Sequence, residues 1–149
     1  MPDTRLHGLE NLEARLAQDL AWLNLPAKSW LNPLDVEGQG VLDVAIIGAG
    51  LCGLVAAAAL RHLGVDNVEL FDRAPEGREG PWVTYARMRT LRTAKAASGP
   101  ALGVGSLTFR AWYEAQWGTD AWDRMDLAPR ETWMDYLVWY RKVTRAKVN

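Results

Sequence analysis

Leucines recur at spacings of three and four residues near the start of the chain, which is the spacing of one face of an α-helix. They are Leu9, Leu12, Leu16, Leu20 and Leu23. Asn24 and Pro26 follow directly, and a proline cannot continue a helix. The pattern therefore predicts an amphipathic helix over residues 9–24, followed by a loop in which Trp30 anchors the chain and which ends at Gly40.

Residues 41–47 form a nearly continuous apolar run, interrupted by Asp43. Such a run is typical of a strand that is buried on both faces in a parallel sheet. The alanine- and leucine-rich residues 51–63 then predict a helix that Gly64 ends, and the short alternating stretch 67–72 predicts a second strand. Strand, helix and strand in this order predict a right-handed βαβ unit with parallel strands.

The regular pattern of hydrophobic and polar residues ends after the second predicted strand. Residues 73–105 are rich in glycine and proline and show little regular pattern, as in a long loop that is functional or disordered. Glu76 and Glu79 lie in it, and we expect both to be solvated charges rather than an acid/base pair. Residues 107–117 predict a helix, and a last helix is expected from Pro129 to about Arg145.

Composition excludes several classes of protein. The chain has 149 residues, 49% hydrophobic and 23% charged, with a net charge of −1, so neither a disordered chain nor a nucleic-acid binder that works by bulk charge is expected. No apolar stretch is long enough for a transmembrane helix, so no membrane partner is expected. Cys52 is the only cysteine of the sequence, so a disulfide framework is excluded and no metal site is expected. A cytoplasmic setting fits this cysteine content best.

Charge is unevenly distributed along the chain. Residues 1–80 carry a net −6 and residues 81–149 a net +5. Four basic residues lie close together, namely Arg87, Arg89, Arg92 and Lys95. They form either an ordinary solvated face or a surface near a phosphate-bearing ligand. Most of the eight tryptophans are expected to fill the core.

The chemistry-bearing motif is G-x-G-x-x-G, formed by residues 48–53 between the first predicted strand and its helix. Gly48 permits the tight turn, Gly50 lets the backbone approach a pyrophosphate, and Gly53 lets the helix pack close to the strand. Leu51 and Cys52 belong to the same turn, where free N–H groups and the helix dipole attract an anion. The alternative is a βαβ unit in which the glycine spacing is coincidental.

A carboxylate in the right place supports a nucleotide. Asp72 ends the second predicted strand, 24 residues after Gly48, where it would accept hydrogen bonds from ribose hydroxyls and repel a 2′-phosphate. The adenosine half is therefore expected to be that of FAD or NAD, although Arg73 next door weakens the exclusion of NADP. No catalytic side chain is evident, which is consistent with a cofactor that carries its own chemistry.

These residues also resemble a family. DVAIIGAGLCGLVAAAAL followed by VELFDR resembles the FAD-binding opening of two-dinucleotide-domain flavoproteins, and GREGPW resembles the Gly-Gly-x-Trp-like segment of flavin-dependent monooxygenases. Residues 88–95, 106–109 and 129–140 are similar to the ornithine and lysine N-hydroxylating branch. The resemblance adds Trp82 and Met88 to the cofactor-binding residues, while Arg89 stands where that branch has an amide side chain.

The resemblance implies an oxidoreductase in which NADPH reduces FAD and the reduced flavin passes one oxygen atom of O₂ to a small-molecule substrate. The fold class it implies is α/β, with residues 1–40 as a helical lead-in and residues 41–149 as an incomplete Rossmann-like FAD-binding domain. The second glycine-rich motif of such enzymes is absent, so we expect no turnover without a missing C-terminal segment or a partner chain. The alternatives are a non-catalytic module that binds NAD or another adenine dinucleotide, and an interaction fragment.

Overall fold

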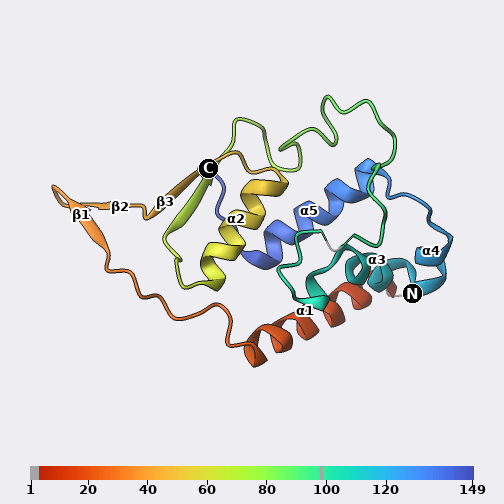
Figure 1. Ribbon diagram of the computed structural model, residues 1–149, viewed down its shortest axis with the longest axis horizontal. Helices are drawn as coiled ribbons and strands as arrows, with labels where there is room; N and C mark the ends of the chain where they lie inside the picture. The colour runs from red at the N-terminus through yellow and green to blue at the C-terminus, as the bar shows by residue number, and fades with distance from the viewer. Residues whose placement is uncertain (1–3, 98) are drawn as a thin grey trace.

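The computed structural model describes residues 4–97 and 99–149 as a mixture of helices and two small sheets (Figure 1). The elements, in chain order, are α1 (Thr4–Trp22), β1 (Leu34–Val36), β2 (Gln39–Val41), β3 (Val44–Ile47), α2 (Leu51–His62), β4 (Val68–Phe71), the 3-10 helix η1 (Gly105–Leu107), α3 (Phe109–Trp117), α4 (Thr119–Arg124) and α5 (Arg130–Thr144). None of the helices in these ranges is long and apolar enough to cross a membrane.

The predicted strand–helix–strand unit is confirmed. β3 and β4 pair in parallel, with Val44 opposite Val68 and Ile47 opposite Phe71, and α2 connects them. The last residues of the chain lie along the other edge of β4, where Leu70 N–H donates to Lys147 O and Asn149 N–H donates to Leu70 O, both at 2.9 Å. β4 is therefore the middle of three parallel segments, and residues 147–149 form the third.

The predicted strand over residues 41–47 is wrong in two respects. Its first residue belongs to a separate antiparallel hairpin, in which Leu34 pairs with Val41, and this hairpin projects from the body (Figure 1). β3 is also not buried on both faces, because Ile47 is 84% exposed. The reason is that α2 packs on one face of the sheet, while Ala45 and Ile47 lie on the other face, which no described element covers.

The core lies between the helices and the covered face of the sheet. Aromatic side chains of α3, α4 and α5 surround Phe109, whose ring centroid lies 5.2 Å from that of Trp133 and 5.4 Å from that of Tyr136. Tyr136 is fully buried and donates its hydroxyl to Leu107 O. The expectation for the tryptophans holds in part: Trp112, Trp122, Trp133 and Trp139 are buried, whereas Trp22, Trp30 and Trp117 are exposed.

The remaining helices follow the predicted pattern with one addition. α1 begins five residues earlier than predicted and packs on α3, with Leu12 and Leu16 buried. The pattern does not predict α4, because six residues are too few to show a helical period. Residues 73–97 and 99–104 contain no helix or strand, in agreement with their glycine and proline content.

The close packing of α2 on β3 gives a prediction about Gly53. A Cβ atom at this position would lie 1.9 Å from Gly48 O, so the substitution Gly53→Ala forces α2 away from the strand. We expect the free energy of unfolding to fall by about 3 kcal/mol, measured by chemical denaturation. The control is Gly40→Ala in β2, where nothing lies within 4 Å of the new Cβ. Equal stability of the two variants would contradict the packing argument.

Candidate functional site

The glycine-rich turn between β3 and α2 has the geometry that its sequence predicts. Gly48 has a φ of +103°, a conformation that L side chains rarely adopt, and nothing lies within 4 Å of the position that a Cβ atom would take there. Gly53 faces Gly48 O across the turn, as described above. The two glycines therefore have the roles assigned to them: Gly48 lets the chain reverse, and Gly53 lets the helix start directly against the strand.

Asp72 holds this turn from the neighbouring strand. Its Oδ2 accepts a 2.8 Å hydrogen bond from Ala49 N–H, and its Oδ1 accepts one of the same length from Ala74 N–H. These two backbone donors lower the pKa of the carboxyl below its usual value, and the N–H of Ala74 has the larger effect. Each carboxylate oxygen has a second lone pair, so the group is able to accept further hydrogen bonds from hydroxyls.

The first turn of α2 offers donors for an anion. In the described ranges, the N–H groups of Leu51, Cys52 and Gly53 make no hydrogen bond. Cys52 is exposed and a free thiol, so this end of the helix is open to solvent. Unpaired N–H groups and the positive end of the helix dipole together attract phosphate. Arg73, also exposed, follows Asp72 directly along the chain.

The segment of residues 77–82 lies against the glycine-rich turn. A Cβ atom on Gly50 would be 3.7 Å from Gly80 Cα, so the two backbones are in contact there. Glu79, beside Gly80, is only 3% exposed, and its Oε1 accepts a 2.7 Å charge-assisted hydrogen bond from Arg141 of α5. The expectation that Glu79 is a solvated charge is therefore wrong, since sequence alone does not show that α5 supplies its partner. The companion expectation for Glu76 holds, since that residue is exposed.

Trp82 and the segment that contains Met88 lie near the N-terminal end of α5. The ring of Trp82 packs edge-on against Trp133, with a centroid distance of 6.2 Å. The segment that contains Met88 is fixed to the start of α5, since Arg130 N–H donates to Arg89 O and Leu91 N–H donates to Ala128 O. The structure thus brings the glycines and Asp72 together, whereas Trp82 contacts Trp133 near the beginning of α5. Met88 is half-buried, in a segment whose backbone is held at the same place.

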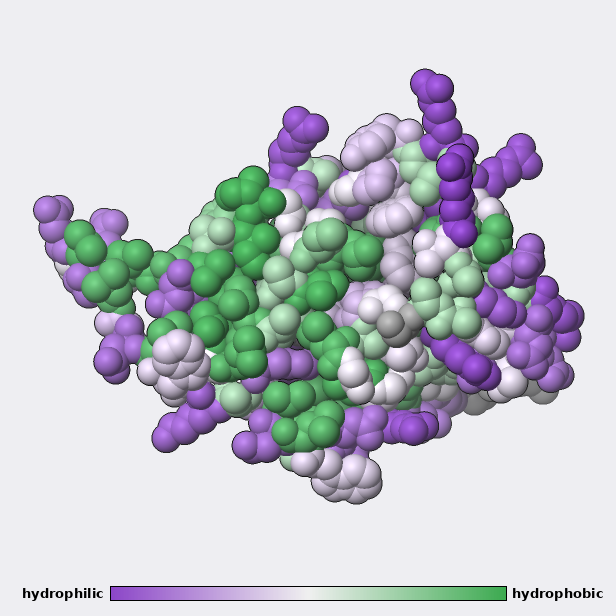
Figure 2. All heavy atoms as spheres, viewed as in Figure 1, coloured by the Kyte–Doolittle hydropathy of each residue, from purple (hydrophilic) through white to green (hydrophobic). Residues whose placement is uncertain are grey.

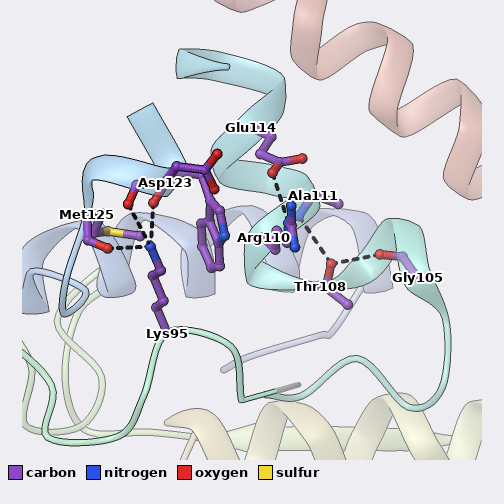
Figure 3. A network of polar contacts seen from close by, with 9 residues as sticks. Lys95, Gly105, Thr108, Arg110, Ala111, Glu114, Asp123 and Met125 are labelled. Atoms are coloured by element: carbon purple, nitrogen blue, oxygen red, sulfur yellow. Dashed lines mark hydrogen bonds and ion pairs between the residues drawn. The ribbon is translucent and has the colours of Figure 1, made fainter. Parts of the chain in front are cut away.

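The four clustered basic residues divide into two groups. Lys95 donates to the carbonyl oxygens of Trp122, Asp123 and Met125, and its Nζ lies 5.3 Å from the centroid of the Trp122 ring (Figure 3). It therefore neutralises the C-terminal end of α4 and is not free to bind a ligand. Arg87, Arg89 and Arg92 are exposed, and long hydrophilic side chains project from the upper side of the molecule in Figure 2.

One cavity between helices lies away from the glycine-rich turn. It has a volume of about 510 Å³ and lies between α1 and the C-terminal ends of α2 and α5. Several of its polar groups are already engaged, since Lys142 pairs with Glu13 at 2.9 Å and Arg61 donates to Thr144 O at 2.8 Å. The part of the chain that the structure describes holds no group of three or more side chains suited to a metal ion. The glycine-rich turn is therefore the better candidate for chemistry.

The hydrogen bonds of Asp72 give a prediction about pH. Because its pKa is lowered on folding, the ionised carboxyl stabilises the fold at neutral pH, and this stabilisation is lost as the pH falls below 3.8. We expect Asp72→Asn to lower the free energy of unfolding by about 1–3 kcal/mol at pH 7, with a smaller difference from the unchanged protein in acid. Chemical denaturation at both pH values measures this, with the exposed Asp126→Asn as the control. A difference that does not change with pH would refute the role of the carboxylate.

Comparisons with known proteins agree with this geometry. Residues 45–149 match the family described as FAD-NAD(P)-binding. The chain is 51% identical over 142 residues to the FAD-dependent urate hydroxylase of Xanthomonas campestris pv. campestris; the match covers 95% of this chain and 30% of the relative. No solved structure matches the chain. The family match begins in β3 and includes the glycine-rich turn, Asp72 and α5, so this chain belongs to the FAD-NAD(P)-binding family.

Proposed function

We propose that this chain is the FAD-binding N-terminal part of a flavin-dependent monooxygenase-type oxidoreductase. The observation that carries the proposal is the glycine-rich turn, in which unpaired N–H groups of α2 lie next to the Asp72 carboxylate. The 51% identity with a protein named as an FAD-dependent hydroxylase supports FAD over a non-catalytic NAD module. The parallel order of β3, β4 and residues 147–149 supports a Rossmann-like domain over residues 41–149.

The residues of the turn fit an adenine dinucleotide. Gly48 and Gly50 carry no side chain to block a diphosphate, and Leu51, Cys52 and Gly53 supply N–H donors. Asp72 has lone pairs left for the ribose hydroxyls, and Arg73 lies beside it. Trp82 and Met88 belong to the segment that would continue along the cofactor towards the flavin. When bound, FAD supplies the redox chemistry, and the described side chains position it.

The substrate and the electron donor are part of the same proposal. The relative is named for urate, and similarity to it supports a small heterocyclic substrate for the whole protein. NADPH is the expected reductant, because the resemblance to flavin monooxygenases implies it. The chain spans only 30% of the length of that relative, so turnover is assigned to the whole protein and not to these residues alone. The single, free Cys52 supports a cytoplasmic setting.

The partner we propose is the polypeptide that corresponds to the rest of the Xanthomonas relative. The free edge of β3 and the uncovered face of the sheet suit it, because parallel sheets are normally covered on both faces. Apolar side chains gather there: Leu34 and Val36 of the hairpin, Ile47 of β3 and Phe71 of β4 are exposed. Figure 2 shows apolar surface on the left side of the molecule, where Figure 1 labels β1, β2 and β3. A patch of this kind marks an interface.

The cofactor site is tested by a substitution at Gly50. Gly50→Val places a branched side chain where it meets Gly80 and fills the approach to the turn, so FAD binding should be lost. A titration that follows flavin fluorescence measures the dissociation constant. Gly40→Val is the control, since it adds the same side chain to β2 in open space. Unchanged FAD affinity of Gly50→Val, or tight binding of NAD with none of FAD, would overturn the proposal.

The proposed interface is tested by a charge on β3. The full chain is co-expressed with the rest of the Xanthomonas relative as a separate polypeptide, and co-purification is measured. Ile47→Lys should abolish co-purification, because Ile47 is 84% exposed on the uncovered strand. Trp22→Lys is the matched control, since Trp22 is 78% exposed at the end of α1. If both variants retain or both lose the partner, the interface is not at β3.

A further inference from the structure

The ion pair between Glu79 and Arg141 is the most buried pair of opposite charges among the described residues. The Glu79 side chain is 4% exposed and that of Arg141 is 19% exposed, with a separation of 2.7 Å. A second carboxylate, that of Glu76, lies 3.9 Å from Arg141, but its side chain is 68% exposed and therefore well hydrated. Arg141 is thus the cation that compensates the buried charge of Glu79.

This pair lies directly behind the glycine-rich turn. Ala49, Gly50, Glu79 and Arg141 line one interior gap of about 10 Å³, together with apolar side chains of α2 and α5. Glu79 and Arg141 are the charged residues of that lining. The gap has room for about one water molecule, so these charges lie close behind the turn. The residue after Glu79 is Gly80, whose backbone contacts Gly50.

A carboxylate in this position conflicts with a diphosphate unless it is compensated. Without Arg141, Glu79 would be a buried negative charge beside a turn that binds two further negative charges. It would also lie near the negative end of the α5 dipole, since Arg141 belongs to the last turn of that helix. Arg141 removes both conflicts and ties α5 to residues 77–82, which keeps Gly80 against Gly50.

We propose that Arg141 is a positioning residue for the diphosphate: it neutralises Glu79 behind the glycine-rich turn and holds residues 77–82 in place. This inference rests on the proposed function, because it requires an adenine dinucleotide at that turn. A positioning role and a purely structural role predict different effects on binding. If Arg141 positions the diphosphate, its removal weakens the binding of ligands that carry a diphosphate and leaves the adenosine contacts at Asp72 unchanged.

The test uses the full chain with Arg141→Gln, Glu79→Gln and the double variant. ADP and adenosine are the probes, and their dissociation constants are measured by titration together with the thermal unfolding midpoint. Arg141→Gln should weaken ADP about tenfold while adenosine changes by less than about threefold. The double variant should recover ADP affinity, because no buried charge is left uncompensated. Arg124→Gln, an exposed change of the same charge, is the control.

Each outcome has a defined meaning. Recovery in the double variant and a selective loss for ADP support the positioning role. Equal losses for ADP and adenosine, or a lower unfolding midpoint with unchanged affinity for both, overturn it and leave the proposed function intact. If the unchanged protein binds neither ADP nor FAD, the proposed function fails, and the positioning role fails with it.

Discussion

The contact between Gly53 and the carbonyl oxygen of Gly48 is the constraint on which the arrangement of this chain depends. A side chain at Gly53 would overlap that oxygen, so only glycine lets α2 begin directly against β3. The first N–H groups of α2 have no intrahelical acceptor, as in any α-helix, and this close start places them at the end of the strand. One steric condition therefore fixes both the packing of the βαβ unit and the position of the donors that a diphosphate requires.

α5 supports the site from behind over most of its length. Its first residues hold the segment around Arg89 and Leu91, its middle residues face the glycine-rich turn, and Arg141 near its end pairs with Glu79. The irregular stretch after Asp72 is thus fixed by backbone and charge contacts to α5, and by Lys95 to the end of α4. This explains how a long loop without secondary structure contributes to an ordered site.

Much of the candidate site can be predicted from the sequence, because its residues follow a short spacing pattern. Gly48, Gly50 and Gly53 lie within one turn, and Asp72 ends the next strand, so a spacing pattern is enough to group them. The burial of Glu79 does not follow from local sequence, because its environment is set by Arg141, 62 residues away. The role of Lys95 is equally hidden, since its acceptors are carbonyl oxygens in and just after α4, a helix too short to be predicted.

The amino-acid sequence by itself determined the βαβ unit, the turn chemistry and the class of ligand, because hydrophobic period and glycine spacing act over a few residues. Only the tertiary structure decided which charges are buried, where Trp82 and Met88 lie, and that, among the described residues, one edge and one face of β3 remain open. These properties arise from contacts between segments far apart in the chain, and neither periodicity nor composition encodes such contacts.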